Sequence, residues 1–355
     1  ITTSMIQGDY VESMIQDKEN EYYMDSDRES SKPLRKFHNW IKYCLITGLC
    51  ENKSVRILDT SIGRGGDIEK YIQSSFNCQF LLGMDINSIN EASRRYYYMK
   101  KNKTPAVFLR YNTGKEILSK EGMYSTPEFP EKDVTHSDAM ISILYKLNTP
   151  IPEIYKPIRE KYQGLAKEKF TLISCQFSLH YYFESETLFN GFVTNLVENC
   201  KTGGYFIGTC YDGKRVFELL TDRESIEYRD AMDNLVYRIS KQYDMTEFGS
   251  QLFGNRIDVY MDSIDSEYSE YLVDFEQFVS IMKQNGFELV KPAMKPEYDI
   301  FQGPMNSFST ILSQLSSFES NSQFRKYYSA SLELQSIPEL QLLSSLNNYF
   351  IFKKY

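Results

Sequence analysis

The segment LISCQFSLHYYFE, from Leu172 to Glu184, decides the expected fold of this chain. It opens with a short apolar run that is typical of a buried strand. Polar and aromatic side chains follow where that strand would end, at Gln176, Phe177, His180 and Tyr181. In an open α/β sheet, ligands lie outside the carboxyl ends of the strands. These four side chains are therefore expected to line a ligand pocket, provided that the upstream chain supplies such a sheet.

The upstream chain has the order strand, glycine turn, helix. Val55 to Thr60 is an apolar run that contains Asp59, and the segments SIGRGGD and IEKYIQS follow it. Gly63, Gly65 and Gly66 allow the backbone to turn tightly and to approach a ligand closely. This order indicates a domain that binds a cofactor at the turn.

Two more strands end beside polar residues that suit such a cofactor. Phe80 to Met84 is an apolar run followed by Asp85, whose carboxylate can accept hydrogen bonds from both hydroxyls of a ribose. Ala106 to Tyr111 leads into Asn112, whose amide can hydrogen-bond an adenine edge. We therefore expect an adenosine-containing ligand on a doubly wound α/β sheet. A dinucleotide is disfavoured, because the first and last glycines of its fingerprint are missing.

Six segments in the same chain order resemble one family, the mRNA cap guanine-N7 methyltransferases. They are LRKFHNWIKYCLI (Leu34 to Ile46), ILDTSIGRGGDIEKY (Ile57 to Tyr71), MDINSINEASRRY (Met84 to Tyr96), ISCQFSLHYYFES (Ile173 to Ser185), TGGYFIGTCYDG (Thr202 to Gly213) and FGNRIDV with EYLVDFEQF (Phe253 to Phe278). The fourth and fifth segments are specific, whereas unrelated methyltransferases share the glycine loop. The resemblance implies a Rossmann-like class I S-adenosylmethionine-dependent methyltransferase fold, with a mixed, mostly parallel sheet and insertions. It also implies S-adenosylmethionine as cofactor, S-adenosylhomocysteine as product and no metal.

The sequence of the glycine loop indicates one branch of this family. GGDIEKY, preceded by Ser61 and Ile62, is most similar to the carboxyl-terminal domain of capping enzymes from large cytoplasmic DNA viruses, of the African swine fever virus or poxvirus type. The resemblance implies methyl transfer to N7 of the guanosine cap at the 5′ end of mRNA, in the host cytoplasm or the virion. It also implies triphosphatase and guanylyltransferase modules upstream in the same polypeptide, and allows for a stimulatory subunit. The start at Ile1, without Met, is expected of a fragment of a longer protein.

The same resemblance implies two sets of site residues. The expected cofactor contacts are Lys42, Ser61, Gly63, Asp85, Asn112, Gln176 and Tyr181. The expected cap contacts are His38, Asn39, Arg64, Phe177, His180, Tyr181, Glu270 and Tyr349. His180, Tyr181 and Glu270 are the expected catalytic residues, which act by positioning and electrostatics. No general base is expected, because guanine N7 carries a free lone pair.

Several positions depart from the cellular pattern of the family. His38 replaces an asparagine, Ser61 and Ile62 replace a glycine-cysteine pair, Arg64 replaces a lysine, and Asn112 replaces an aspartate. The changes at Ser61, Ile62 and Asn112 motivate an alternative, a non-catalytic methyltransferase-like subunit that binds or stimulates a catalytic capping partner. A third alternative is methylation of a protein or a small molecule. The retained Asp85, His180, Tyr181 and Glu270 favour the cap methyltransferase.

Composition is consistent with this interpretation. The chain has 355 residues, of which 41% are hydrophobic, and no long uncharged apolar run that would span a membrane. Its six cysteines have irregular spacing, which predicts buried thiols in a reducing compartment. The net charge of −8 argues against binding long RNA by general phosphate neutralisation.

The pattern along the chain predicts its organisation. Residues 1–32 are expected to form a polar linker or arm, and residues 33–355 the methyltransferase domain. A long insertion is expected at about 115–169, with a helix around His136 to Leu147. The basic stretch Arg94 to Lys103 is interpreted as a solvated helix end in preference to a nucleic-acid surface. Further helices are expected at Lys214–Leu220 and Ser269–Asn285, which would place Glu270 at a helix start, and strands at Tyr205–Thr209 and Tyr349–Phe352.

Overall fold

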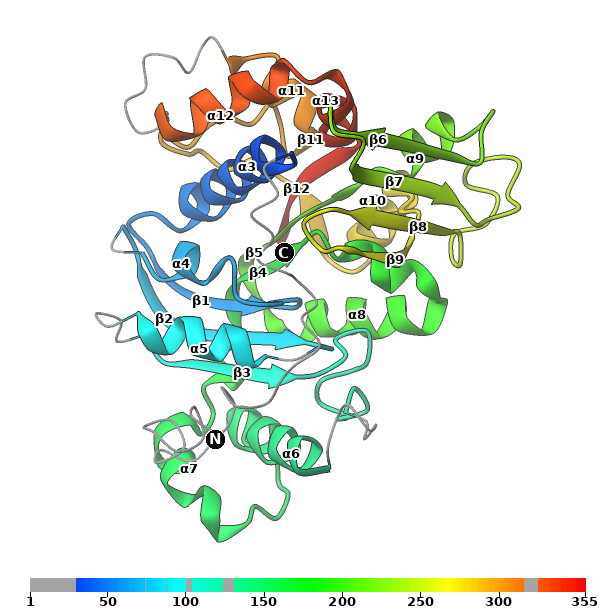
Figure 1. Ribbon diagram of the computed structural model, residues 1–355. Helices are drawn as coiled ribbons and strands as arrows, with labels where there is room; N and C mark the ends of the chain where they lie inside the picture. Colours follow the sequence, from blue (N-terminus) through cyan, green and yellow to red (C-terminus); the bar gives the residue numbers. More distant parts are fainter. Residues whose placement is uncertain (1–29, 74, 88, 100–103, 124–130, 316–324) are drawn as a thin grey trace.

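The computed structural model describes residues 30–73, 75–87, 89–99, 104–123, 131–315 and 325–355. Most of the predicted arm and the last residues of the basic stretch, 100–103, lie outside this set. The described chain contains an eight-stranded main sheet with helices on both faces and a second sheet of four strands (Figure 1).

The main sheet has the strand order β10-β12-β5-β4-β1-β2-β3, with β11 beside β12. Its strands are β1 (Ser54–Asp59), β2 (Asn77–Asp85), β3 (Ala106–Arg110), β4 (Phe170–Gln176), β5 (Cys200–Tyr211), β10 (Phe287–Leu289), β11 (Met305–Ser307) and β12 (Asn347–Lys354). Strands β1 to β5 run parallel, and β12 pairs antiparallel with β5. The strand order reverses between β1 and β4, where open α/β sheets bind their ligands. These pairings confirm the predicted doubly wound, mostly parallel sheet and its predicted strands.

Two hydrophobic cores cover the two faces of this sheet. Parallel strands that are buried on both faces need nearly continuous apolar runs, such as that of β1, where all residues after Ser54 are buried. One core includes α3 (Lys32–Cys50), α4 (Ile68–Tyr71), α5 (Asn90–Tyr98), α9 (Gly213–Leu219), α11 (Phe308–Leu312), α12 (Arg325–Gln335) and α13 (Pro338–Ser345). The other includes α6 (Glu131–Tyr145), α7 (Lys156–Tyr162), α8 (Glu186–Asn199) and α10 (Phe275–Gln284). Trp40 is fully buried in the first core.

The insertion lies beside the β3 edge of the main sheet (Figure 1). The predicted helix around His136 to Leu147 is confirmed as α6, which begins earlier and ends at Tyr145. Short 3-10 turns, η1 (Glu153–Tyr155) and η2 (Ala166–Glu168), flank α7. Arg56 of β1 fastens the end of the insertion, because its guanidinium donates to the carbonyl oxygens of Leu165 and Lys169.

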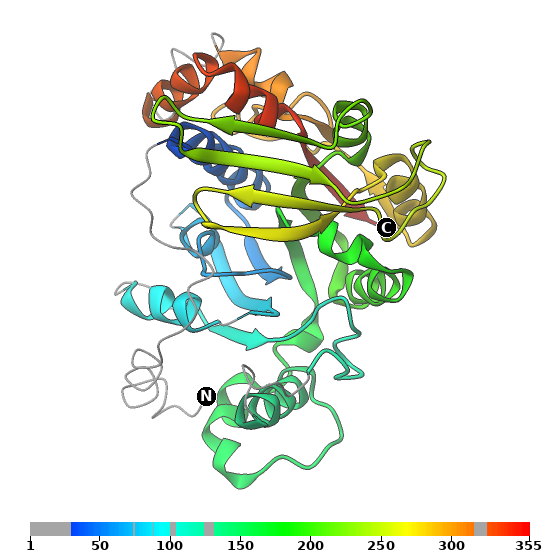
Figure 2. The ribbon, with the colours of Figure 1, turned by 45° about the vertical axis from the view of Figure 1, so that its right-hand side comes forward.

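The second sheet was not predicted, and it corrects the helix expected at Ser269–Asn285. Its antiparallel strands are β6 (Ser225–Arg229), β7 (Leu235–Lys241), β8 (Arg256–Met261) and β9 (Ser266–Tyr271). Glu270 therefore lies on a strand, paired with Ile257 of β8. Helix α10 begins only at Phe275, because Asp274 caps it by accepting a hydrogen bond from the Gln277 amide at 3.0 Å. Figure 2 shows this sheet in front of the main sheet.

The second sheet is attached beside the carboxyl end of β4. The 3-10 segment η3 (Leu179–Glu184) follows β4 closely, and β9 lies against it. The Gly254 amide donates to the carbonyl oxygen of Phe183 at 2.9 Å. This attachment brings Glu270 to the edge of the main sheet where the QFSLHY residues lie.

The close packing of β5 provides a test of the sheet. A Cβ at Gly208 would lie 2.2 Å from the Cys175 carbonyl oxygen and 2.4 Å from Cζ of Phe350. We predict that Gly208→Ala lowers the free energy of unfolding by about 1–3 kcal/mol or more, because a packed interior cannot accept the methyl group. Urea denaturation measures this loss, with Gly66→Ala as control, since a Cβ there would meet no atom within 4 Å. Equal midpoints for the two variants would contradict the described packing.

Candidate active site

The glycine turn after β1 and the end of β2 are joined through Asp85. The Gly63 amide donates to Oδ2 of Asp85 at 2.8 Å, and the Asn87 amide donates to Oδ1 at 2.8 Å. Burial raises the pKa of Asp85, and these backbone donors oppose that rise. Each carboxylate oxygen keeps a further lone pair for a ligand hydroxyl. A Cβ built at Gly63 would meet no atom within 4 Å, so the loop borders open space that fits a cofactor.

A buried carboxylate beneath the turn fixes its shape. Asp59 accepts hydrogen bonds from the Ser61 amide at 2.9 Å and from the Tyr71 hydroxyl at 2.7 Å. Burial raises the pKa of Asp59 to about 7. The Ser61 hydroxyl in turn contacts the hydroxyl of Ser178, which lies between β4 and η3. The cofactor turn and the QFSLHY segment therefore touch.

An ion cluster joins the same turn to α3. Asp67 lies between Lys42 and Lys70, whose ammonium nitrogens are 2.8 and 2.7 Å from its Oδ1. Burial opposes ionisation of Asp67, but the two lysines hold its pKa well below its usual range. Burial also lowers the pKa of Lys42. Asn39 accepts a hydrogen bond from Lys70 at 3.3 Å. The sequence predicted Lys42 and Asn39 as site residues but not Asp67 and Lys70. Only the position of Asp67 and Lys70 in the GGDIEK segment, next to the glycine turn, could have indicated them.

The end of β4 holds a strained turn. Phe177 has a φ of +54°, which is rare for a residue with a side chain, and its amide donates to the Thr209 carbonyl oxygen at 2.9 Å. The Thr209 hydroxyl donates to Oε1 of Gln176 at 3.0 Å. The Phe177 ring stacks on His38 with centroids 5.2 Å apart, and the Lys42 ammonium lies 5.8 Å from its centroid. Such strain persists where surrounding contacts enforce it, as they do at functional sites.

His180 of η3 and Glu270 of β9 face each other across the two sheets. His180 is 3% exposed, and its Nε2 lies 3.7 Å from Oε1 of Glu270, which is too long for a hydrogen bond. Its Nδ1 contacts the Cys210 thiol at 3.7 Å. Burial lowers the pKa of His180 to about 3 and raises that of Glu270 to about 8. Both groups are therefore neutral at pH 7 in this structure.

Two buried polar atoms of this pair have no hydrogen-bond partner within the described chain. They are Nε2 of His180 and Oε2 of Glu270. Leaving buried polar groups unpaired is costly, so such atoms call for a ligand. The expected cap contacts His180 and Glu270 thus form a candidate purine pocket. Tyr181 lies at its exposed rim, with its ring centroid 4.2 Å from that of His180 and its side chain 36% exposed.

The remaining predicted residues occupy different settings. Asn112 follows β3 and accepts a hydrogen bond from the Gly114 amide at 2.9 Å. Arg64 makes no hydrogen bond or ion pair to any described residue and is half-buried on the glycine turn. Tyr349 is fully buried, opposite Thr209 in the β5–β12 pair, and its hydroxyl donates to the Gly303 carbonyl oxygen at 3.4 Å. Tyr349 is therefore buried within the main sheet, and its contact with the cap stays a prediction.

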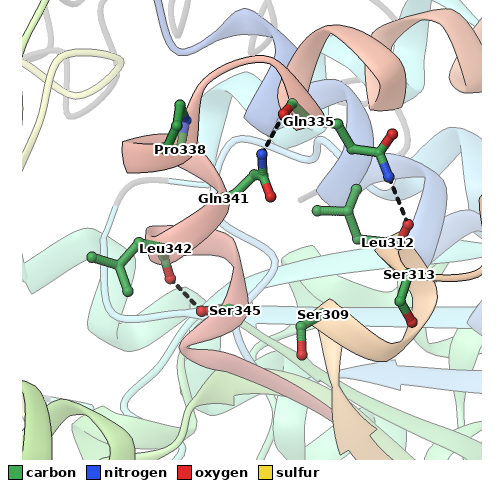
Figure 3. A pocket seen from close by; sticks show the side chains of 8 residues that line it. All are labelled: Ser309, Leu312, Ser313, Gln335, Pro338, Gln341, Leu342 and Ser345. Carbon is green, nitrogen blue, oxygen red and sulfur yellow. Dashed lines mark hydrogen bonds between the residues drawn. The ribbon is translucent and has the colours of Figure 1, made fainter.

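A separate cleft of about 410 Å³ lies among α11, α12 and α13 (Figure 3). None of its lining residues belongs to the predicted set. Three of its polar side chains donate to carbonyl oxygens within the cleft: Gln335 to Leu312 at 2.9 Å, Ser345 to Leu342 at 2.7 Å, and Gln341 to Gln335. It is not the candidate active site.

The described ranges contain no group of three or more His, Cys, Asp or Glu side chains placed to hold a metal ion. They also contain no helix that is both long and apolar enough to cross a membrane. The six cysteines are buried and unpaired, as predicted.

The doubly wound sheet, with its antiparallel β12, its glycine turn and its acidic β2 end, defines a class I S-adenosylmethionine-dependent methyltransferase fold. A methyltransferase structure from Clostridium acetobutylicum aligns with 90% of this chain and 91% of its own, at 12% identity and a TM-score of 0.44. The chain belongs to the mRNA (guanine-N(7))-methyltransferase domain family, whose model matches residues 6–134 and 146–336. This membership confirms the resemblance found in the sequence. The residues between the two matched segments, 135–145, lie in α6 of the insertion.

Named relatives agree with the family. A probable mRNA-capping enzyme of Acanthamoeba polyphaga mimivirus is 29% identical over 94% of this chain and 28% of its own length. The mRNA cap guanine-N(7) methyltransferase of Candida albicans is 26% identical over 79% of this chain and 56% of its own. The mRNA cap guanine-N(7) methyltransferase of Drosophila melanogaster is 26% identical over 83% of this chain and 62% of its own length. The chain therefore spans between 28% and 62% of the length of these relatives, which is less than two thirds of each.

Asp85 provides a direct test of the cofactor pocket. We predict that Asp85→Ala weakens S-adenosylmethionine binding by one to two orders of magnitude, because each charge-assisted hydrogen bond contributes about 1.5–3 kcal/mol. Titration calorimetry measures the dissociation constant. Asp85→Asn, which keeps one acceptor for the Gly63 amide, should lose less. Unchanged affinity in the alanine variant would remove Asp85 from the pocket.

Glu270 provides a test based on pH. Its pKa rises from 4.5 to about 8 on folding, so between these values the folded state holds a proton that the unfolded state has lost. The Glu270 contribution to stability is therefore present at low pH and declines as pH rises through this window. We predict that the stability of Glu270→Gln relative to wild type increases from pH 5 to pH 8, measured by urea denaturation. A difference that is constant with pH would show that Glu270 is not buried as described.

Proposed function

We propose that this chain transfers a methyl group from S-adenosylmethionine to N7 of the guanosine cap of mRNA. The observation that carries the proposal is the pair of buried, unpartnered atoms, Nε2 of His180 and Oε2 of Glu270, next to the cofactor turn. The N1–H and N2–H groups of guanine are donors that match a carboxylate. Held by this edge, the base leaves N7 free.

The cofactor supplies an electrophilic methyl group on a sulfonium. Asp85 would hold the ribose, the open face of Gly63 would receive the methionine part, and Gln176 and Asn112 would line the adenosine side. Lys42, another expected cofactor contact, is held beside the glycine turn by its ion pair with Asp67. Arg64, which has no hydrogen-bond or ion-pair partner among the described residues, lies on the turn and would bind a cap phosphate with its planar fork.

Catalysis here requires no proton transfer before attack, because the N7 lone pair is free. His180 has a pKa of about 3 through burial, so it is a neutral imidazole at pH 7 and a poor base. The protein's contribution is positioning, which can supply roughly 7–11 kcal/mol at near-attack geometry. Tyr181, at the rim beside His180, would fix the distance between the two ligands.

Glu270 would add electrostatic stabilisation. Its carboxyl is protonated at pH 7 in this structure, since burial raises its pKa to about 8. Guanine donors favour the ionised form, so cap binding should displace this proton. The resulting carboxylate then faces the positive charge that develops on the methylated base.

The wider role of the protein is part of the same proposal. Because the chain matches 28% of a probable viral mRNA-capping enzyme, we propose that triphosphatase and guanylyltransferase modules belong to the same polypeptide. Six buried free thiols support a reducing location such as the cytoplasm. A non-catalytic subunit is the second candidate, favoured only by the departures at Ser61, Ile62 and Asn112.

The experiment that separates the candidates uses labelled S-adenosylmethionine and RNA with an unmethylated guanosine cap. We expect label in the cap, released as 7-methylguanosine. RNA whose cap already carries the N7 methyl group is the matched control and should accept none. Transfer to neither substrate would leave the non-catalytic role, and label in both would mean a different target atom.

Tyr181 provides a test of positioning. We predict that Tyr181→Ala lowers the turnover number at saturating cofactor and cap by at least tenfold, because the rate depends on the alignment of the reactants. Tyr97→Ala, which removes an exposed tyrosine at the end of α5, is the control and should keep full activity. A change confined to KM would assign Tyr181 to binding alone.

A further inference from the structure

A second cleft lies at the opposite end of the main sheet from the candidate active site. It has a volume of about 400 Å³ and is bordered by the end of α3, the starts of β1 and β4, and parts of β5 and β12. The parallel strands begin here and end at the cofactor turn. With about 3.3 Å per residue, the six residues of β1 separate the two sites by roughly 20 Å.

Three lysines line this cleft, and no acidic residue does. They are Lys53, Lys201 and Lys353. Lys53 donates to the Leu49 carbonyl oxygen at 2.7 Å and keeps two N–H groups, and the Lys353 ammonium lies 5.3 Å from the Tyr355 ring centroid. None of the three forms an ion pair within the described residues. Glu288 is opposite Lys353 in the β10–β12 pair without pairing with it.

The basic stretch noted in the sequence differs from the cleft in this respect. Arg94 and Arg95, in the basic stretch noted in the sequence, both pair with Glu91. The positive charge of that stretch is thereby reduced over its described part. The three cleft lysines form no such ion pair within the described residues.

Neighbouring lysines add to the positive potential at this end of the sheet. The Lys354 ammonium donates to the Cys200 carbonyl oxygen at 3.2 Å. Burial lowers its pKa, and repulsion from Lys169 lowers it further. The turn at Gly203 borders open space, since a Cβ there would meet no atom within 4 Å. A backbone phosphate can approach the lysines at this point.

We propose that this lysine cleft binds the phosphate backbone of RNA downstream of the cap. The inference rests on the proposed function, because a capped transcript is what brings such a strand to the protein. The net charge of −8 disfavours RNA binding by general phosphate neutralisation, so a cleft lined by three lysines and no acidic residue is a favourable place for phosphates. An RNA strand whose cap is bound at the candidate active site would run along the surface from the carboxyl ends of the parallel strands to the lysine cleft at their amino ends.

The test compares two triple variants of the full chain. One carries Lys53→Glu, Lys201→Glu and Lys353→Glu, and the control carries Lys146→Glu, Lys156→Glu and Lys283→Glu, which change net charge equally at exposed sites elsewhere. Binding of an uncapped, fluorescent RNA of about 20 nucleotides is measured by anisotropy against salt. The cleft variant should bind at least tenfold more weakly at low salt. Its slope of log K against log salt should fall by about 2, three contacts at roughly 0.7 each.

Equal losses in both variants would overturn the proposal, because net charge alone would then explain binding. Absence of RNA binding by the wild-type chain would overturn it too. Methyl transfer to the cap dinucleotide GpppG is measured in parallel and should be the same in the wild type and the cleft variant. If no chain methylates the dinucleotide, the proposed function fails, while the binding comparison still reports on the cleft.

Discussion

The candidate site depends on a carboxyl group and an imidazole that face each other at 3.7 Å in a buried setting, each with an unpartnered atom. No single sheet can supply both. His180 follows β4 of the main sheet, whereas Glu270 lies on the outer strand of the second sheet. The attachment of Gly254 to Phe183 holds the sheets in this relation. Burial then keeps both groups neutral at pH 7, and we propose that a guanine supplies the missing partners.

On the cofactor side, ion pairs between buried side chains hold the glycine turn in place. Asp67 joins Lys42 of α3 to the glycine turn, and Asp59 supports the turn from beneath. Removing one partner from such a cluster leaves a buried charge, so the turn is held firmly. The contact between Ser61 and Ser178 transmits that rigidity to the QFSLHY segment. The expected cofactor contacts on the glycine turn and the QFSLHY segment are therefore parts of one connected framework.

The sequence predicts the parallel strands well, because strands buried on both faces carry continuous apolar runs. It does not predict β9, whose residues are half-exposed on an edge strand and whose spacing continues the helical period of α10. The resemblance located Glu270, yet only the structure shows it on a strand facing His180. Asp67 and Lys42 are 25 residues apart, and nothing local indicates that they pair. Tyr349 was predicted at the cap, but it is buried against Phe301 at a centroid distance of 4.6 Å.

We propose that guanine binding ionises Glu270, whose pKa is about 8 in this structure. Titration calorimetry of GpppG at pH 7, in buffers of different ionisation enthalpy, counts the protons released on binding. The account predicts release of nearly one proton by the wild-type chain and none by Glu270→Gln. Equal release by both chains, or none by the wild type, would contradict it.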